Sequence, residues 1–181
     1  MVNIYKQELT ILQQEILRVL FAKVGKSLNQ RQIAKILEVS QAGIIKALPK
    51  LKEKDYVRVN QDEESKRWAI ELNTDNPKVI QLKRGDNLKK IYESGLVDHL
   101  QKEFPGGTII LFGSYSRGED TIDSDIDIAI IGRKEKDIGF GFNKRLEKEI
   151  NINFYPSFKE IHKHLKDNIL NGIILSGSVE L

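Results

Sequence analysis

The feature that most constrains the fold is a pair of apolar runs that flank a polar, acidic segment within residues 108–132. The first run, TIILFG, is short and rich in β-branched residues, so it predicts a buried strand. In the second run, SDIDIAIIG, alternation places Asp125 and Asp127 on one face of a strand and three isoleucines on the other. The two carboxylates then project side by side, about 7 Å apart along the strand, where they can coordinate one cation or two.

Two simpler interpretations compete with a cation site. Asp123, Asp125 and Asp127 resemble the start of an EF-hand calcium loop. That loop needs glycine and glutamate at the positions where this chain has Ile128 and Lys134, so it is excluded. A solvated turn and edge strand is the other interpretation. The adjoining isoleucines favour a half-buried strand instead, in which an unpaired charge is costly.

The segment as a whole resembles the motif of the nucleotidyltransferase superfamily of DNA polymerase beta. Gly113-Ser114 is followed by Arg117-Gly118 and, after a short spacer, by Ser-Asp-x-Asp. The resemblance covers about residues 86–181 and is closest to the minimal nucleotidyltransferases, including archaeal proteins that carry one behind a winged helix. It implies an α+β fold with a small mixed sheet.

The resemblance also implies a nucleotide-binding role for Gly113, Ser114 and Arg117. A glycine at the end of a strand lets a triphosphate approach the backbone. The helix that begins at Ser114 presents N–H groups that attract phosphate, and Arg117 adds a charge-assisted contact. The expected substrate is a nucleoside triphosphate, taken as ATP.

Asp125 and Asp127 are implied to be the catalytic residues and the ligands of Mg²⁺, which activates a hydroxyl acceptor for attack on the α-phosphorus. Glu119, Asp120 and Asp123 have no role in the family, so we expect them to be loop charges.

The chain departs from the family at the third carboxylate, which a neighbouring strand normally supplies. The matching strand is EININFYP, where the expected aspartate falls at Asn151 or Asn153. An amide can offer an oxygen to a cation but brings no negative charge. Glu149 has the same alternation parity and is the alternative third ligand. The sequence therefore leaves it open whether activity survives.

The N-terminal part predicts three helices followed by a hairpin, which is the order of a winged helix-turn-helix. Apolar residues recur at helical spacing and Ser40 is the expected N-cap of the third helix, while YVRVN and RWAIEL read as the hairpin strands. RQIAKILEVSQAGIIKAL resembles the helix-turn-helix of archaeal and bacterial regulators. Ile36 is expected to face inward. Glu38 replaces a common turn glycine, and Pro49 is expected to kink or shorten the third helix.

A DNA-binding role follows from this resemblance and from the basic charge of the N-terminal part. The residues expected in the major groove are Gln41, Ala42, Ile45 and Lys46. The residues expected at phosphates are Lys50, Lys54, Arg58, Lys66 and Arg67. A domain used only for protein contacts or dimerisation is the competing interpretation.

The domain organisation follows from these segments and the breaks between them. We expect a winged helix-turn-helix domain over residues 1–75 and a nucleotidyltransferase domain over 105–181. Between them, residues 76–104 predict a connecting helix that is interrupted near Gly85 and Gly95. The expected fold class is therefore α+β throughout.

Composition limits the cellular setting and separates the charges of the two parts. Residues 1–60 hold 11 Lys/Arg and 5 Asp/Glu, a net charge of +6, so the remainder of a chain of net charge +3 carries −3. The absence of cysteine excludes disulfides and thiolate metal sites. No signal-peptide core and no uncharged membrane-spanning run is present, so we expect a cytoplasmic protein without a membrane partner.

Two main hypotheses remain open. In the first, the protein binds DNA and transfers a nucleoside monophosphate from a nucleoside triphosphate to a hydroxyl acceptor, which in related minimal nucleotidyltransferases can be a tyrosine of a partner toxin. In the second, it is a transcriptional regulator whose transferase domain is a nucleotide sensor or dimerisation module. A homodimer fits both, and a protein-interaction scaffold without either ligand is a third hypothesis.

Overall fold

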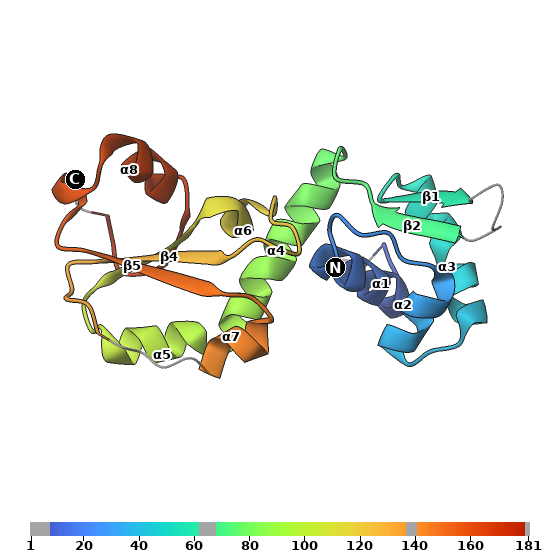
Figure 1. The fold of residues 1–181 in the computed structure, drawn as a ribbon, viewed down its shortest axis with the longest axis horizontal. Coiled ribbons are helices and arrows are strands. Elements are labelled where there is room, and N and C mark those ends of the chain that lie inside the picture. The colour runs from blue at the N-terminus through green and yellow to red at the C-terminus, as the bar shows by residue number, and fades with distance from the viewer. Residues whose placement is uncertain (1–7, 62–67, 137–140, 180–181) are drawn as a thin grey trace, which may run out of the picture. The chain divides into compact units, whose positions relative to one another are not determined.

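The computed structural model describes residues 8–61, 68–136 and 141–179, and within it the chain forms two compact units. The first unit ends at Val79 and the second begins at Ile80. Figure 1 shows the ribbon, with helices and strands labelled in chain order.

The N-terminal unit is a three-helix core with a two-stranded sheet, as the sequence predicts. Its elements are α1 (Ile11–Ala22), α2 (Gln30–Leu37), α3 (Gln41–Glu53), β1 (Val57–Gln61) and β2 (Trp68–Leu72). The strands pair antiparallel, and Leu28 forms an isolated bridge to Ile70 of β2. Ser40 caps α3 by accepting a hydrogen bond from the Gly43 amide at 3.1 Å. Lys66 and Arg67, expected in the wing, lie outside the described residues.

Two details of the helix-turn-helix differ from the expectations. Helix α3 continues through Pro49 to Glu53 and is not shortened. Leu48 and Leu51 are buried on either side of the proline, and burying two leucines yields about 3 kcal/mol or more, enough to offset a proline within the helix. Ile36 is 50% exposed rather than inward. Glu38 has φ 55°, the left-handed conformation that explains why glycine is common there.

The second unit is built on a four-stranded mixed sheet of order β5-β4-β3-β6. Its strands are β3 (Thr108–Phe112), β4 (Ile126–Ile131), β5 (Ile150–Tyr155) and β6 (Ile173–Ser176). β3 pairs antiparallel with β4 and β6, whereas β4 and β5 run parallel. The expected small mixed sheet is confirmed.

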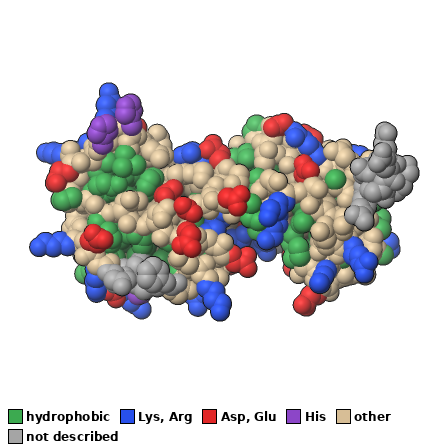
Figure 2. Space-filling model, viewed as in Figure 1, with side chains coloured by type: hydrophobic (Ala, Val, Ile, Leu, Met, Phe, Trp, Pro, Cys, Tyr) green, Lys and Arg blue, Asp and Glu red, His purple; other side chains and the backbone are tan. Residues whose placement is uncertain are grey.

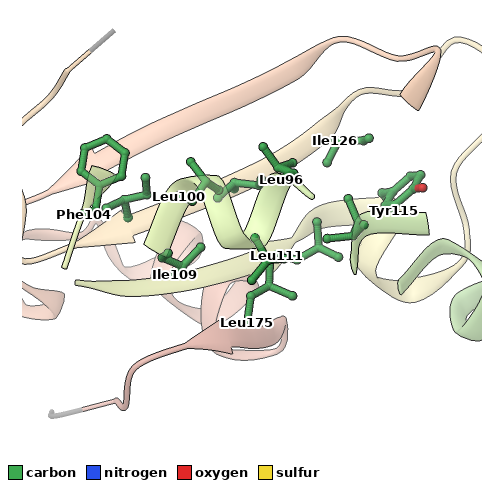
Figure 3. Packing of buried hydrophobic residues seen from close by; sticks show 12 residues of the cluster. Leu96, Leu100, Phe104, Ile109, Leu111, Tyr115, Ile126 and Leu175 are labelled. Atoms are coloured by element: carbon green, nitrogen blue, oxygen red, sulfur yellow. The ribbon is translucent and has the colours of Figure 1, made fainter. Parts of the chain in front are cut away.

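Alternating side chains of the sheet enter two separate cores. On one face, Ile109 and Leu111 of β3 pack with Ile126, Ile128 and Ile130 of β4. This face is covered by α5 (Leu96–Glu103), which Figure 3 shows through Leu96 and Leu100. On the other face, Ile110, Phe112, Ala129 and Ile131 pack against a 3-10 helix and α8 (Lys163–Leu170). In Figure 1, α5 and α8 accordingly lie on opposite faces of the sheet.

The segment 76–104, predicted to connect the domains, forms α4 (Pro77–Glu93) and α5 (Leu96–Glu103). The predicted break near Gly95 is confirmed, and Gly95 has φ 78°. The predicted interruption near Gly85 is wrong, because α4 passes through it without a break. A glycine within a helix is tolerated at a cost of about 1 kcal/mol, and Lys83 and Ile91 anchor α4 by being buried on either side of it.

The remaining helices are short. The basic helix α7 spans only Gly141–Leu146. After Ser157 the chain forms a 3-10 turn, Phe158–Glu160, and then α8. The Ser157 hydroxyl bonds the Glu160 side chain and, among the described residues, caps no backbone amide.

Candidate active site

The site begins where β3 ends and α6 (Gly113–Arg117) starts. Gly113 has φ +75°, a conformation that L side chains rarely adopt. A Cβ at this position would also collide with the carboxylate of Asp127. Glycine is therefore required here for two reasons, its backbone conformation and the close approach of Asp127.

Asp125 directly precedes β4, and Asp127 is its second residue. Asp127 lies opposite Asn151 in the parallel register of β4 and β5. The Asn151 amide donates to Oδ2 of Asp125 at 3.1 Å and lies 3.5 Å from Oδ1 of Asp127. The structure thus places the two carboxylates together and sets an amide against both. Figure 2 shows acidic side chains gathered over the region of β4 and β5 on one face of this unit.

The register also decides which asparagine faces the acidic pair. Asn153 lies opposite Ala129, two pairs further along the strands. Glu149 precedes β5, and its carboxylate accepts a hydrogen bond from the Asn143 side chain at 3.0 Å. Glu149 and Asp125 both line an open hollow of about 470 Å³ beside the site. Asn151 therefore faces the two aspartates, and Glu149 lines the hollow beside them.

Arg117 ends α6 and is engaged with side chains of its own unit. Its Nε donates to Glu119 at 2.7 Å, and its Nη1 donates to Asn168 of α8 at 3.1 Å. The Arg117 side chain remains 40% exposed. In the part of the chain that the structure describes, no side chain caps the N-terminus of α6 by a hydrogen bond, and Ser114 is half-buried in its first turn.

Asp120 is not the loop charge that the sequence suggested. It is 2% exposed and forms an ion pair with Lys83 of α4, which is 1% exposed. Asn87, one turn after Lys83, donates to Asp120 Oδ1 at 2.6 Å and to the Tyr115 carbonyl at 3.0 Å. Burial lowers the pKa of the Lys83 ammonium, and the Asp120 charge opposes that shift. Burial also raises the pKa of the Tyr115 phenol, with a smaller contribution from Asp120.

Neither Lys83 nor Asn87 belongs to the motif that predicts the site. A signal for them exists, because residues 83, 87 and 91 recur every four positions and so share one face of α4. Ile91 on that face is fully buried. A lysine and an asparagine on a buried helical face require polar partners, and Asp120 is the partner of both.

Lys148 joins the same network from the segment before β5. Its Nζ lies 3.6 Å from Oδ2 of Asp120. The same Nζ donates to the carbonyl oxygens of Thr121 at 2.7 Å and Ser124 at 2.8 Å. Lys148 therefore bonds the backbone of the loop that leads to Asp125.

The site has few potential ligands, but they suit a divalent cation that prefers oxygen ligands. Asp125 and Asp127 present two carboxylates, the ligands that Mg²⁺ prefers. Within the described residues, no group of three acidic, histidine or cysteine side chains is placed to hold a metal ion. A half-turn of the Asn151 amide would present its oxygen in place of its nitrogen. The residues thus fit one cation held by two carboxylates, with a neutral third position.

In the N-terminal unit, the residues expected to contact bases lie on the accessible part of α3. Gln41, Ala42, Ile45 and Lys46 are exposed, and Lys50 is partly exposed and paired with Glu53 at 3.1 Å. Two of the expected phosphate contacts are also paired within the unit, Lys54 with Glu8 and Arg58 with Asp75. DNA would compete with these carboxylates for the two cations.

The fold is a winged helix followed by an α+β domain that brings two carboxylates together. Comparison with domain families agrees: residues 9–70 match the winged helix DNA-binding domain, and residues 93–176 match the nucleotidyltransferase domain. The chain therefore carries a winged helix DNA-binding domain followed by a nucleotidyltransferase domain. No protein of curated function matches the chain significantly.

Solved structures resemble parts of the chain. A MepR mutant from a multidrug resistant Staphylococcus aureus clinical isolate is 27% identical over 41% of this chain, with a TM-score of 0.37, and the match spans 54% of the MepR chain. ZitR of Lactococcus lactis is 20% identical over 57% of this chain and 68% of its own, with a TM-score of 0.42. A toxin-antitoxin structure with AMP-PNP is 24% identical over 48% of this chain and 73% of its own, with a TM-score of 0.39.

No helix among the described residues has the length and apolar character to cross a membrane.

Proposed function

We propose that the protein is a DNA-associated nucleotidyltransferase that transfers a nucleoside monophosphate from a nucleoside triphosphate, taken as ATP, to a hydroxyl acceptor. The observation that carries this proposal is the convergence of Asp125 and Asp127 beside Gly113. In the reaction, the acceptor oxygen forms a bond to the α-phosphorus and pyrophosphate departs. The nucleotidyltransferase family match supports this reaction class.

Each residue of the site has a defined part in this proposal. Asp125 and Asp127 are the catalytic residues and would hold Mg²⁺ through their carboxylate oxygens. When bound, that ion supplies Lewis-acid stabilisation of the charge that develops on the phosphates and the acceptor. Gly113 lets the triphosphate reach the backbone of α6, and Ser114 adds a hydroxyl beside it.

Arg117 would bind a phosphate in exchange for Glu119. The present Arg117–Glu119 pair is exposed on both sides, and such pairs are worth only about 0.2–1 kcal/mol. A triphosphate carrying several charges can therefore displace Glu119, while the bond from Arg117 to Asn168 keeps the guanidinium oriented.

A transfer assay with labelled ATP, Mg²⁺ and cell lysate tests the enzymatic proposal. Product that appears with the wild-type protein and is lost in Asp125→Asn and Asp127→Asn variants supports it. A labelled product that persists in both variants, or no product across all four nucleoside triphosphates, refutes it. Lysate is needed because the acceptor, which we expect to be a protein partner such as a toxin, is unidentified.

The Asn151 amide favours a second candidate function. A neutral residue at the third position weakens the site that would activate the acceptor, whereas nucleotide binding needs fewer charges. In this alternative the protein is a transcriptional regulator whose transferase domain senses nucleotide or mediates dimerisation. It predicts sequence-specific DNA protection that survives Asp127→Ala and changes when ATP is added.

In either function we propose that the winged helix binds DNA through α3. Gln41, Ala42, Ile45 and Lys46 would face the major groove, with Lys50 at the backbone. The exposure of these side chains and the winged helix family match support the assignment. Footprinting of the gene's own promoter at stated salt, together with sedimentation to detect a homodimer, tests it.

A further inference from the structure

The loop from Gly118 to Asp125 is fixed at its first residue by close packing against α4. Gly118 has φ +77°, and a Cβ there would collide with the carbonyl of Ile80 and the amide of Arg84. Two residues later, the buried Asp120 accepts hydrogen bonds from Lys83 and Asn87 of the same helix. The proximal half of the loop is thus held by α4.

The distal half of the loop is held by the segment that leads into β5. Lys148 donates to the carbonyls of Thr121 and Ser124, at 2.7 and 2.8 Å. The Ser124 carbonyl belongs to the peptide bond that Asp125 follows. Next in line, the Ile126 amide donates to the Glu149 carbonyl at 2.9 Å. Lys148 therefore bonds the Ser124–Asp125 peptide group, whose position determines the position of the Asp125 Cα and side chain.

Lys148 is itself held in place by charge. Its ammonium lies 3.6 Å from Asp120, and its side chain is 11% exposed. Asp120 is the shared partner of Lys83 and Lys148, so two cations converge on one buried carboxylate. A buried ionic group is often no better for stability than an apolar replacement. This arrangement is better explained by the geometry that it imposes on the loop.

We propose that Lys148 is a positioning residue for the Asp125 carboxylate, and that the buried Lys83–Asp120 pair holds Lys148 where it clamps the loop. This inference rests on the proposed cation site at Asp125 and Asp127. It adds a role for residues outside the motif, and it assigns that role to hydrogen bonds with the backbone of the loop.

The direction in which Mn²⁺ affinity changes when Lys148 is removed separates a positioning role from a purely Coulombic effect. Lys148 is a cation near a cation site, so its Coulomb effect alone opposes metal binding. Removing it would then tighten Mn²⁺ binding. If Lys148 positions Asp125, its removal weakens Mn²⁺ binding, by about tenfold or more, as is typical when a group that orients a metal ligand is lost.

The experiment compares wild type with Lys148→Met, Lys148→Arg and Lys102→Met, using Mn²⁺ titration followed by electron paramagnetic resonance. Lys102 is an exposed lysine on α5 and controls for the loss of one charge. We expect weaker binding in Lys148→Met, recovery in Lys148→Arg, which keeps the charge and can donate to two carbonyls, and no loss in Lys102→Met. Unchanged or tighter binding in Lys148→Met overturns the proposal.

Amide hydrogen exchange tests the same proposal without metal. The amides of Thr121, Ser124 and Ile126 are hydrogen-bonded within or beside the loop. In Lys148→Met they should exchange faster, while the β3–β4 ladder stays unchanged and reports that the fold is intact. Unchanged exchange of the loop amides overturns the proposal. If wild type binds no Mn²⁺, the proposed function loses its cation site, and exchange alone decides the role of Lys148.

Discussion

The amide nitrogen of Asn151 lies 3.1 Å from Oδ2 of Asp125. The same nitrogen is 3.5 Å from Asp127, so one neutral group faces two carboxylates that repel each other. An amide donor offsets part of that repulsion. The pair is therefore held together by the protein before any cation arrives.

Replacing Asn151 with aspartate should strengthen cation binding and weaken the apo protein. Asn151→Asp adds a third carboxylate where the amide donor stood. We expect the Mn²⁺ dissociation constant to fall about tenfold, equivalent to about 1.4 kcal/mol, and the apo form to lose about 1 kcal/mol as the hydrogen bond goes. Titration calorimetry and thermal unfolding with and without MnCl₂ measure both effects.

Asn153→Asp is the matched control for that variant. It makes the same chemical change on the same strand, but Asn153 lies opposite Ala129 and not opposite an acid. A similar gain in Mn²⁺ affinity in both variants would mean that added negative charge acts from a distance. Asn151 would then not occupy the third ligand position.

Gly113→Ala should abolish Mn²⁺ binding as well as lower stability, because its effect is larger than the cost of a positive φ alone. An alanine in the left-handed region costs about 1–2 kcal/mol, and at Gly113 the new Cβ also displaces the Asp127 carboxylate. Gly132→Ala is the control, since Gly132 has φ +78° and no described atom lies within 4 Å of its added Cβ. We expect comparable backbone costs in calorimetry and loss of Mn²⁺ binding only in Gly113→Ala. Equal Mn²⁺ binding in the two variants would contradict the expected displacement of Asp127 by the new Cβ.

Local patterns in the sequence predicted the parts of the site that depend on neighbouring residues. Alternation placed Asp127 on the face opposite the buried isoleucines, and the Gly113-Ser114 pair marked the end of β3, both as the structure has them. The parallel pairing of β4 and β5 joins segments more than 20 residues apart. The sequence therefore did not determine whether Asn151 or Asn153 faces the aspartates. The register of the two strands places Asn151 there.

Long-range contacts also explain where the structure differs from the local pattern of the sequence. Asp120 resembles its acidic neighbours in the chain, and its burial depends on Lys83, 37 residues away. The continuity of α3 through Pro49 and of α4 through Gly85 likewise depends on the side chains that each helix buries. Local propensity is a weak guide where packing supplies several kcal/mol.

The buried charges predict unequal costs for two single substitutions. Asp120→Asn leaves the ammonium groups of Lys83 and Lys148 without their shared anion, so we expect a loss of about 3 kcal/mol or more. Lys83→Met should cost less, because Asp120 keeps Lys148 and Asn87 as partners. Differential scanning calorimetry is the suitable measurement. The single tryptophan, Trp68, lies in the winged helix and would report on the other unit.

The double variant, Lys83→Met with Asp120→Asn, isolates the coupling between these two residues. It should lose less stability than the sum of the single variants, by about 1 kcal/mol or more. Additive losses would show that Lys83 and Asp120 stabilise the unit independently.

Lys46 should contribute to DNA affinity in a way that salt reveals. Lys46 is an exposed cation on α3. A lysine that neutralises a phosphate releases counterions from the DNA, which makes the association constant depend on salt. If Lys46 touches a phosphate, Lys46→Ala should weaken binding to all sequences and reduce the slope of log K against log salt by about 1. If it reads a base instead, the loss should be confined to the specific site and the slope should change little. Fluorescence anisotropy at several salt concentrations separates the two results.

Lys102→Ala in the transferase unit removes the same charge away from the helix-turn-helix, so an equal loss of DNA affinity in that variant would contradict a local contact of Lys46.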